Sequence, residues 1–128
     1  MTGLSKIALV IGVEAPLGVK LARWLAGFGI DSLHVADAGD GLALSAAIDP
    51  DLIILADQAA GPELLDFLVQ TAAKPGRRPT RVMLCARERN AALLGAAVAE
   101  GAAECLVAPF DADLLKFKLE QTGVLAVQ

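Results

Sequence analysis

Short apolar runs alternate with longer segments of helical spacing along the whole chain. Between the runs, apolar residues recur every three or four positions, as in Leu17, Leu21 and Leu25. Continuous apolar strands are typical of a sheet covered on both faces, and their alternation with helices indicates parallel pairing. The pattern predicts an α/β fold with a five-stranded parallel sheet, doubly wound as (βα)5. The predicted strands are 6–11, 32–36, 52–55, 81–85 and 104–107.

Proline, glycine and aspartate mark the ends of the predicted helices. We expect Asp40 to cap the second helix and Asp111 the last, because a carboxylate accepts a hydrogen bond from an unpaired N–H of the first turn. Pro50 ends the second helix, since proline disfavours the helical conformation in its predecessor. The domain is expected to cover 1–123, with 124–128 a tail or the start of a linker. The predicted helices are 16–28, 41–48, 62–73, 90–100 and 112–122.

The many apolar residues of this chain are expected to form a protein core and not a membrane span. The 128 residues are 55% hydrophobic, and 25 of them are alanine. The longest stretch without a charged side chain has ten residues, 90–99, about half of the roughly 20 that cross a bilayer. No basic segment followed by an apolar one marks the N-terminus for secretion. We therefore expect a cytoplasmic protein without a membrane span.

The net charge and the two cysteines argue against some kinds of partner and site. The net charge of −4 argues against a nucleic-acid partner, because phosphate binding needs a basic surface. Cys85 and Cys105 lack metal-ligand spacing, and we expect them to pack as small apolar side chains, with a redox pair as the alternative. His34 is expected to be a packed or surface residue, and Trp24 to pack on the sheet.

In an open parallel sheet, ligands bind at the carboxyl ends of the strands. Three segments of this chain resemble the receiver domain of bacterial response regulators. Pro50-Asp-Leu-Ile-Ile-Leu55 is similar to its third strand, Ala38-Gly-Asp-Gly-Leu-Ala43 to its second helix start, and Gly101-Ala-Ala-Glu-Cys-Leu-Val-Ala-Pro-Phe-Asp111 to its fifth strand and lysine-proline junction. The resemblance covers almost the whole chain. It implies the flavodoxin-like fold and a cis peptide bond between Ala108 and Pro109.

The sequence departs from the receiver pattern where the family's reaction takes place. The acidic pair that holds Mg²⁺ aligns with Gly12 and Val13, or with Ile11 and Gly12 in a register shifted by one residue. The phosphorylated aspartate aligns with Ala56, the switch Thr/Ser with Cys85, and the lysine with Ala108. Alanine cannot accept a phosphoryl group, and a hard cation needs oxygen ligands. We interpret the chain as a pseudo-receiver that is not an enzyme and uses no metal or cofactor.

Two other readings of the strand ends stay open. Asp57 follows the acceptor position directly and is an alternative phosphoacceptor, although a one-residue shift in a strand reverses the side-chain direction. Val10-Ile-Gly-Val-Glu-Ala-Pro-Leu-Gly18 resembles the glycine-rich turn of short-chain dehydrogenases, with Asp37 placed for ribose recognition. Pro16 in place of the middle glycine opposes a dinucleotide, because it has no N–H and its ring crowds the phosphates. The chain has no tyrosine, so the catalytic Tyr-Lys pair of that family is missing.

The arginines and the fourth helix are the candidate binding surfaces. Arg77 and Arg78 lie in a loop at the amino end of the sheet, and Arg87 and Arg89 lie at the carboxyl end. Arg77 and Arg78 could hold an acidic protein face or a cyclic dinucleotide, and Arg87 and Arg89 could hold an anion beside the acceptor position, because arginine pairs with phosphate bidentately. The alternative is that these arginines lie in solvated loops. The resemblance implies docking through the fourth helix, fifth strand and last helix, to a histidine kinase, a regulator or a second copy of the chain as a homodimer. On the fourth helix, the candidate contact residues are Leu93, Leu94 and Ala97. The alternative is that the alanine content of this helix reflects helix propensity alone.

Overall fold

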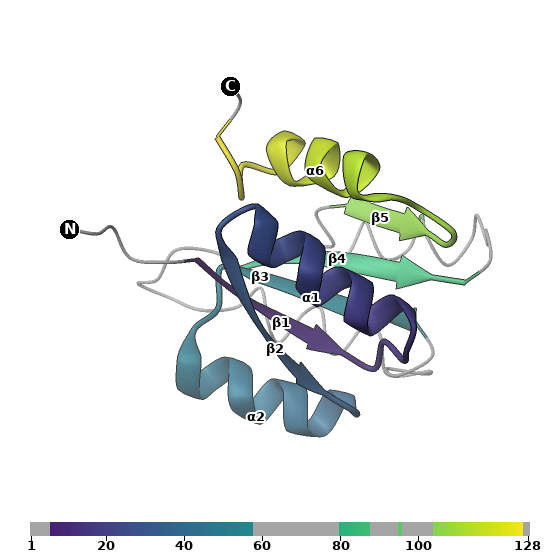
Figure 1. The fold of residues 1–128 in the computed structure, drawn as a ribbon. Helices are drawn as coiled ribbons and strands as arrows, with labels where there is room; N and C mark the ends of the chain where they lie inside the picture. Colours follow the sequence, from purple (N-terminus) through teal and green to yellow (C-terminus); the bar gives the residue numbers. More distant parts are fainter. Residues whose placement is uncertain (1–5, 58–79, 88–94, 96–103, 127–128) are drawn as a thin grey trace.

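A computed structural model describes residues 6–57, 80–87, 95 and 104–126 (Figure 1). Five parallel strands form one sheet in the order β2-β1-β3-β4-β5. The predicted α/β class and the doubly wound five-stranded sheet are confirmed, and the second strand begins two residues earlier than predicted. The strands are β1 (Lys6–Ile11), β2 (Ile30–Val35), β3 (Leu52–Ala56), β4 (Arg81–Ala86) and β5 (Glu104–Val107).

Helices cover both faces of the sheet, as the apolar strands require. Helices α1 (Leu17–Gly27) and α6 (Ala112–Gln121) lie on one face, where their buried leucines pack with alternate residues of the central strands. Helix α2 (Ala38–Ile48) lies on the other face and packs against Leu9 and Ile11 of β1. The helices predicted at 62–73 and 90–100 fall outside the described residues, apart from Gly95, which is helical.

Aspartate caps begin two of the helices. The Asp111 carboxylate accepts a hydrogen bond from the Leu114 N–H at 2.9 Å, as predicted. The prediction for α2 was wrong: the cap is Asp37, whose carboxylate accepts from the Asp40 N–H at 2.8 Å. Asp37 has the extended backbone that an N-cap requires, whereas Asp40 already lies in the first turn. The helix therefore begins three residues earlier than expected.

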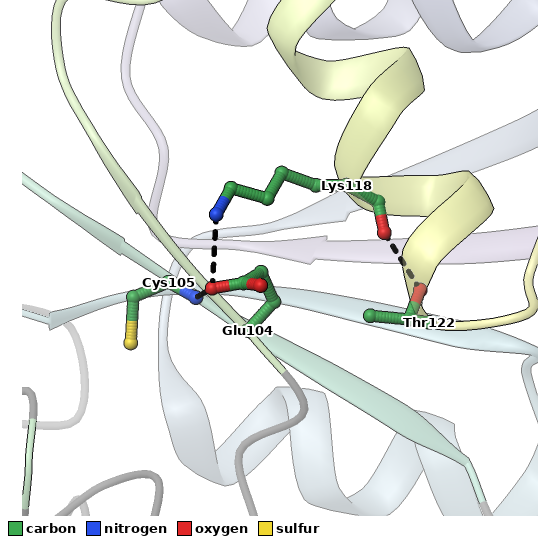
Figure 2. Close-up of polar contacts among 4 residues, drawn as sticks. All are labelled: Glu104, Cys105, Lys118 and Thr122. Atoms are coloured by element: carbon green, nitrogen blue, oxygen red, sulfur yellow. Dashed lines mark hydrogen bonds and ion pairs between the residues drawn. The ribbon is translucent and has the colours of Figure 1, made fainter.

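Helix α6 is attached to β5 by a small polar network (Figure 2). One oxygen of Glu104, Oε1, accepts a hydrogen bond from the Cys105 N–H at 2.9 Å and lies 3.2 Å from Lys118 Nζ. At the C-terminal end of the helix, Thr122 Oγ1 donates a hydrogen bond to the Lys118 carbonyl at 3.0 Å. The Glu104–Lys118 ion pair is the contact of this network that links β5 to α6.

The amino end of the sheet joins segments that are far apart in sequence. The Asp51 carboxylate accepts a hydrogen bond from the Ile7 N–H at 2.9 Å, and Lys6 Nζ donates to the Val124 carbonyl. With Asp49 and Arg81, these side chains line a cavity of about 120 Å³. Val124, the first residue of the predicted tail, is buried in the core. Among the described helices, none combines the length and the apolar character needed to cross a membrane.

Candidate functional site

The carboxyl ends of β1, β3, β4 and β5 surround a pocket of about 230 Å³. It lies where an open parallel sheet places its ligands. The structure brings together here all five positions that align with receiver chemistry, which are Gly12, Val13, Ala56, Cys85 and Ala108. The other residues that line it are Glu14, Ala15, Pro16, Leu17, Asp57, Ala86 and Arg87.

The floor of the pocket is apolar. Ala56 ends β3 and Cys85 lies beside it on β4, in register, and both are 5% exposed. Burial raises the pKa of the Cys85 thiol to about 11, with a smaller contribution from the negative charge of Asp57. Because the thiolate is the nucleophile and the metal ligand, Cys85 at neutral pH is a neutral packing residue.

Asp57 lines the pocket despite its one-residue offset from the acceptor position. Strand β3 ends at Ala56, so the alternation that separates neighbouring side chains within a strand does not extend to Asp57. Asp57 and Cys85 line the same pocket, and the negative charge of Asp57 contributes to the raised pKa of the Cys85 thiol. Within the described residues, no three His, Cys, Asp or Glu side chains are grouped so that they could hold a metal ion.

The backbone geometry of the turn between β1 and α1 explains why glycines are present there, without any need for a bound phosphate. Gly12 has a φ of 74°, a conformation that glycine adopts readily. A Cβ on Gly18 would lie 2.7 Å from the Val13 carbonyl oxygen. The Gly18 N–H donates to the Glu14 carbonyl at 2.9 Å, and Pro16 has no N–H. The donors that a pyrophosphate needs at a helix N-terminus are thus reduced.

Asp37, the predicted ribose ligand of the dinucleotide alternative, has a local structural role. It caps α2 through its hydrogen bond with the Asp40 N–H. The geometry of the turn and this cap together do not favour the dinucleotide alternative.

The two cysteines lie on opposite faces of the sheet. Cys85 pairs in register with Leu106, whereas Cys105 pairs with Leu84, one position away. Side chains alternate along a strand, so Cys85 packs in the core beneath α1 and α6, and Cys105 packs against the core beneath α2. The expected packing role is confirmed, and this arrangement is incompatible with a redox pair between them.

Trp24 and His34 each have neighbours within the fold. Trp24 packs against the core with its ring centroid 6.1 Å from that of Phe110, as expected. His34 is exposed on the edge strand β2, and its Nε2 lies 3.2 Å from Ser32 Oγ.

The candidate arginines are only partly described. Arg87 is exposed and lines the carboxyl-end pocket, and Arg81 lines the cavity at the opposite end of the sheet. The remaining candidate residues fall outside the described residues, and their role stays a prediction; these are Arg77, Arg78, Arg89, Leu93, Leu94 and Ala97.

Sequence reasoning missed an exposed apolar pair on α6. Phe117 is 52% exposed and Leu114 is 38% exposed, and they lie three residues apart on one side of the helix. The signal was present, because Leu115 and Leu119 already fill the buried positions of α6 and leave Phe117 outside that stripe.

Comparisons with known proteins support the fold. No family model matches the sequence, and no curated protein matches it. A solved chemotaxis response regulator of Vibrio cholerae has a TM-score of 0.80 at 18% identity, with 93% of this chain and 99% of that one covered. An orphan response regulator of H. pylori has a TM-score of 0.79 at 20% identity, covering 92% and 96%.

A third solved structure is an atypical orphan response regulator described as having a phosphorylation-independent regulatory mechanism. Its TM-score is 0.77 at 19% identity, with 91% of this chain and 93% of that one covered. The chain therefore has the fold of response-regulator receiver domains. The Ala108–Pro109 peptide bond is cis, as the resemblance implied, and Ala15–Pro16 is cis as well.

Proposed function

We propose that this chain is a signalling module of the bacterial two-component type that binds proteins without being phosphorylated. The observation that carries the proposal is the pocket at the carboxyl end of the sheet. In the resemblance to the receiver pattern, Ala56 takes the acceptor position, Gly12 and Val13 the Mg²⁺ positions and Ala108 the lysine position, and all four line this pocket. A methyl group cannot accept a phosphoryl group, and these side chains supply no oxygen to a hard cation.

The proposed docking surface includes α6. Its exposed Leu114 and Phe117 form an apolar face of the kind that protein interfaces use. The partner is a histidine kinase, a regulator or a second copy of the chain, and the module works in the cytoplasm.

The chemical half of the proposal is tested by phosphodonor labelling. The chain is incubated with acetyl phosphate and Mg²⁺, and intact-mass spectrometry measures any added phosphoryl group. We expect none, whereas a phosphorylatable receiver treated in parallel gains one. Stoichiometric modification that disappears in the Asp57→Asn variant would overturn the proposal and establish Asp57 as the acceptor.

The binding half is tested by comparing surface variants. Phe117→Glu places a charge on the α6 face, and Val19→Glu is the matched control on α1, because Val19 is 57% exposed. We expect Phe117→Glu to weaken self-association in sedimentation or partner capture by at least tenfold, and Val19→Glu to leave it unchanged. Equal effects of the two variants would show that α6 is not the docking surface.

A further inference from the structure

Strand β2 forms one outer edge of the sheet. In the part of the chain that the structure describes, β1 is the only strand beside it. The Gly12 N–H donates a hydrogen bond to the Val35 carbonyl at 2.9 Å, so Val35 directs its backbone groups toward β1. Because this direction alternates along a strand, Leu33 does the same, and the N–H and C=O groups of Ser32 and His34 point outward. The outer edge of β2 therefore offers hydrogen-bonding groups to another strand.

The sequence of β2 leaves this edge open to pairing. Sheet edges are commonly protected by lysine, proline or a bulge. The segment Ile30–Val35 contains neither lysine nor proline, and its register with β1 runs without a bulge. Leu33 is 45% exposed, and it pairs in register with Leu9, which places its side chain on the face that α2 covers. The strand thus combines an unprotected backbone edge with an exposed apolar side chain.

A second copy of β2 fits this edge in one antiparallel register. Around a twofold axis at right angles to the sheet, opposed side chains lie on the same face, so the axis passes through a residue. An axis at Leu33 sets this residue opposite its own counterpart. Ser32 then lies opposite His34, and Asp31 lies opposite Val35. Ser32 Oγ and His34 Nε2 lie 3.2 Å apart within one chain, so the same two groups are compatible across the strands.

The two neighbouring registers are less favourable. An axis at Ser32 sets the exposed Leu33 opposite the Asp31 carboxylate, which removes the apolar contact. An axis at His34 keeps only residues 33–35 within the paired strands. The register centred on Leu33 therefore combines an apolar central pair with compatible polar neighbours, and cross-strand pairs of this kind stabilise a sheet.

We propose that two copies of this chain pair through β2, antiparallel and centred on Leu33, to form one continuous sheet. The outward N–H and C=O groups of Ser32 and His34 bond to the other copy. The two Leu33 residues meet at a non-hydrogen-bonded position, where paired Cα atoms lie about 4.5 Å apart. The inference does not depend on the proposed function, because β2 and β5 are opposite edges of the sheet and α6 is linked to β5.

Cysteine crosslinking of the full chain tests the register. A disulfide needs Cα atoms about 4.4–6.8 Å apart, so Leu33→Cys should give a covalent dimer when oxidised with copper phenanthroline, as measured by non-reducing electrophoresis. His34→Cys is the matched control on the same edge, because this register sets it opposite Ser32 and not opposite itself. Val19→Cys, at a position 57% exposed on α1, measures random collision. We expect Leu33→Cys to crosslink roughly tenfold faster than either control.

Sedimentation measures the pairing without a crosslink. Leu33→Asp sets two carboxylates opposite each other and should weaken self-association by roughly tenfold or more, whereas Val19→Asp should leave it unchanged. Ser32→Pro removes an outward N–H and spares the bonds to β1, so it should also weaken self-association while circular dichroism shows a folded chain. In the Leu33→Asp background, Phe117→Glu reports on α6 alone, so failure of this inference and failure of the proposed function are distinguished.

Several outcomes would overturn the inference. One is a chain that stays monomeric up to about 1 mM, where even weak association is visible. Equal crosslinking of Leu33→Cys and Val19→Cys would assign the product to collision, and faster crosslinking of His34→Cys would exclude a register centred on Leu33. Self-association that Phe117→Glu abolishes and Leu33→Asp leaves intact would place the contact at α6.

Discussion

At the scale of single residues, burial determines the chemistry of Cys85. An accessible thiol at the end of a strand would be a reactive group, but this one lies between β3 and β5 at 5% exposure. Desolvation penalises the thiolate, and the negative charge of Asp57 adds to that penalty. Cys105 on the opposite face is less buried, and its pKa is also raised, by burial and by Glu104, with an opposing effect from Lys118.

Alkylation should reveal this difference between the two thiols. Below a pKa of about 11, the thiolate fraction of Cys85 rises about tenfold for each pH unit. We therefore expect its rate with iodoacetamide, followed by peptide mass spectrometry, to keep rising to about pH 11, and Cys105 to react first at every pH. Asp57→Asn should move the Cys85 profile to lower pH. A Cys85 profile that levels off near pH 8 would contradict this assignment.

Two glycines of α1 provide a second residue-scale prediction. A Cβ at Gly18 would lie 2.7 Å from the backbone oxygen of Val13, whereas at Gly27 it would meet nothing within 4 Å. Gly18→Ala should lower the free energy of unfolding by about 1–3 kcal/mol because the β1–α1 turn must shift. Gly27→Ala should be neutral or stabilising by up to about 1 kcal/mol. Urea unfolding measures both, and equal values would refute the close approach.

At the scale of elements, the start of α2 can be tested through its two aspartates. Asp37→Ala removes the carboxylate that accepts the Asp40 N–H and should cost about 1 kcal/mol of unfolding free energy. Asp40→Ala removes only a negative charge from the first turn. It should lower the free energy of unfolding by at most about 1 kcal/mol, and salt should make this loss smaller. If thermal unfolding showed a larger loss of stability for Asp40→Ala than for Asp37→Ala, Asp40 would be the N-cap, as the sequence predicted.

These helix and strand ends also show how far the sequence predicts elements. The strands were predictable because short runs of Val, Ile and Leu between turn signals, such as Leu52–Ala56, are typical of a sheet buried on both faces. The cap of α2 was not, because Asp37 and Asp40 are equivalent in chemistry and three positions apart. The choice between them depends on the backbone after β2, which the hydrogen bond from the Gly12 N–H to the Val35 carbonyl helps to fix.

At the scale of the whole molecule, one sheet carries two cores that should unfold together. Trp24 packs with the core beneath α1 and α6, and Leu84 is fully buried in the core beneath α2. Leu84→Ala should cost about 2–5 kcal/mol and shift Trp24 fluorescence and far-ultraviolet circular dichroism to the same lower urea midpoint. Fluorescence that keeps its original midpoint while the dichroism shifts would show that the two faces unfold independently.

The site was predictable in one respect and not in another. The convergence of Gly12, Ala56, Cys85 and Ala108 followed from parallel pairing, because the carboxyl ends of parallel strands meet at one edge. The contribution of Leu17 to the pocket wall depends on how the first turn of α1 sits over that edge, which no local pattern encodes. The same applies to the amino-end cavity, whose lining residues are far apart in sequence.

The contact between Lys6 and the Val124 carbonyl brings the beginning of the first strand against the segment that follows the last helix. A short peptide bridge could therefore close the backbone into a ring, and new ends could be opened at an exposed turn elsewhere. Such a circular permutant would keep the strand order and leave the carboxyl-end pocket unobstructed, since the bridge would lie at the opposite edge of the sheet. The geometry makes this domain suitable for insertion into a surface loop of a host protein, held by two closely spaced tethers.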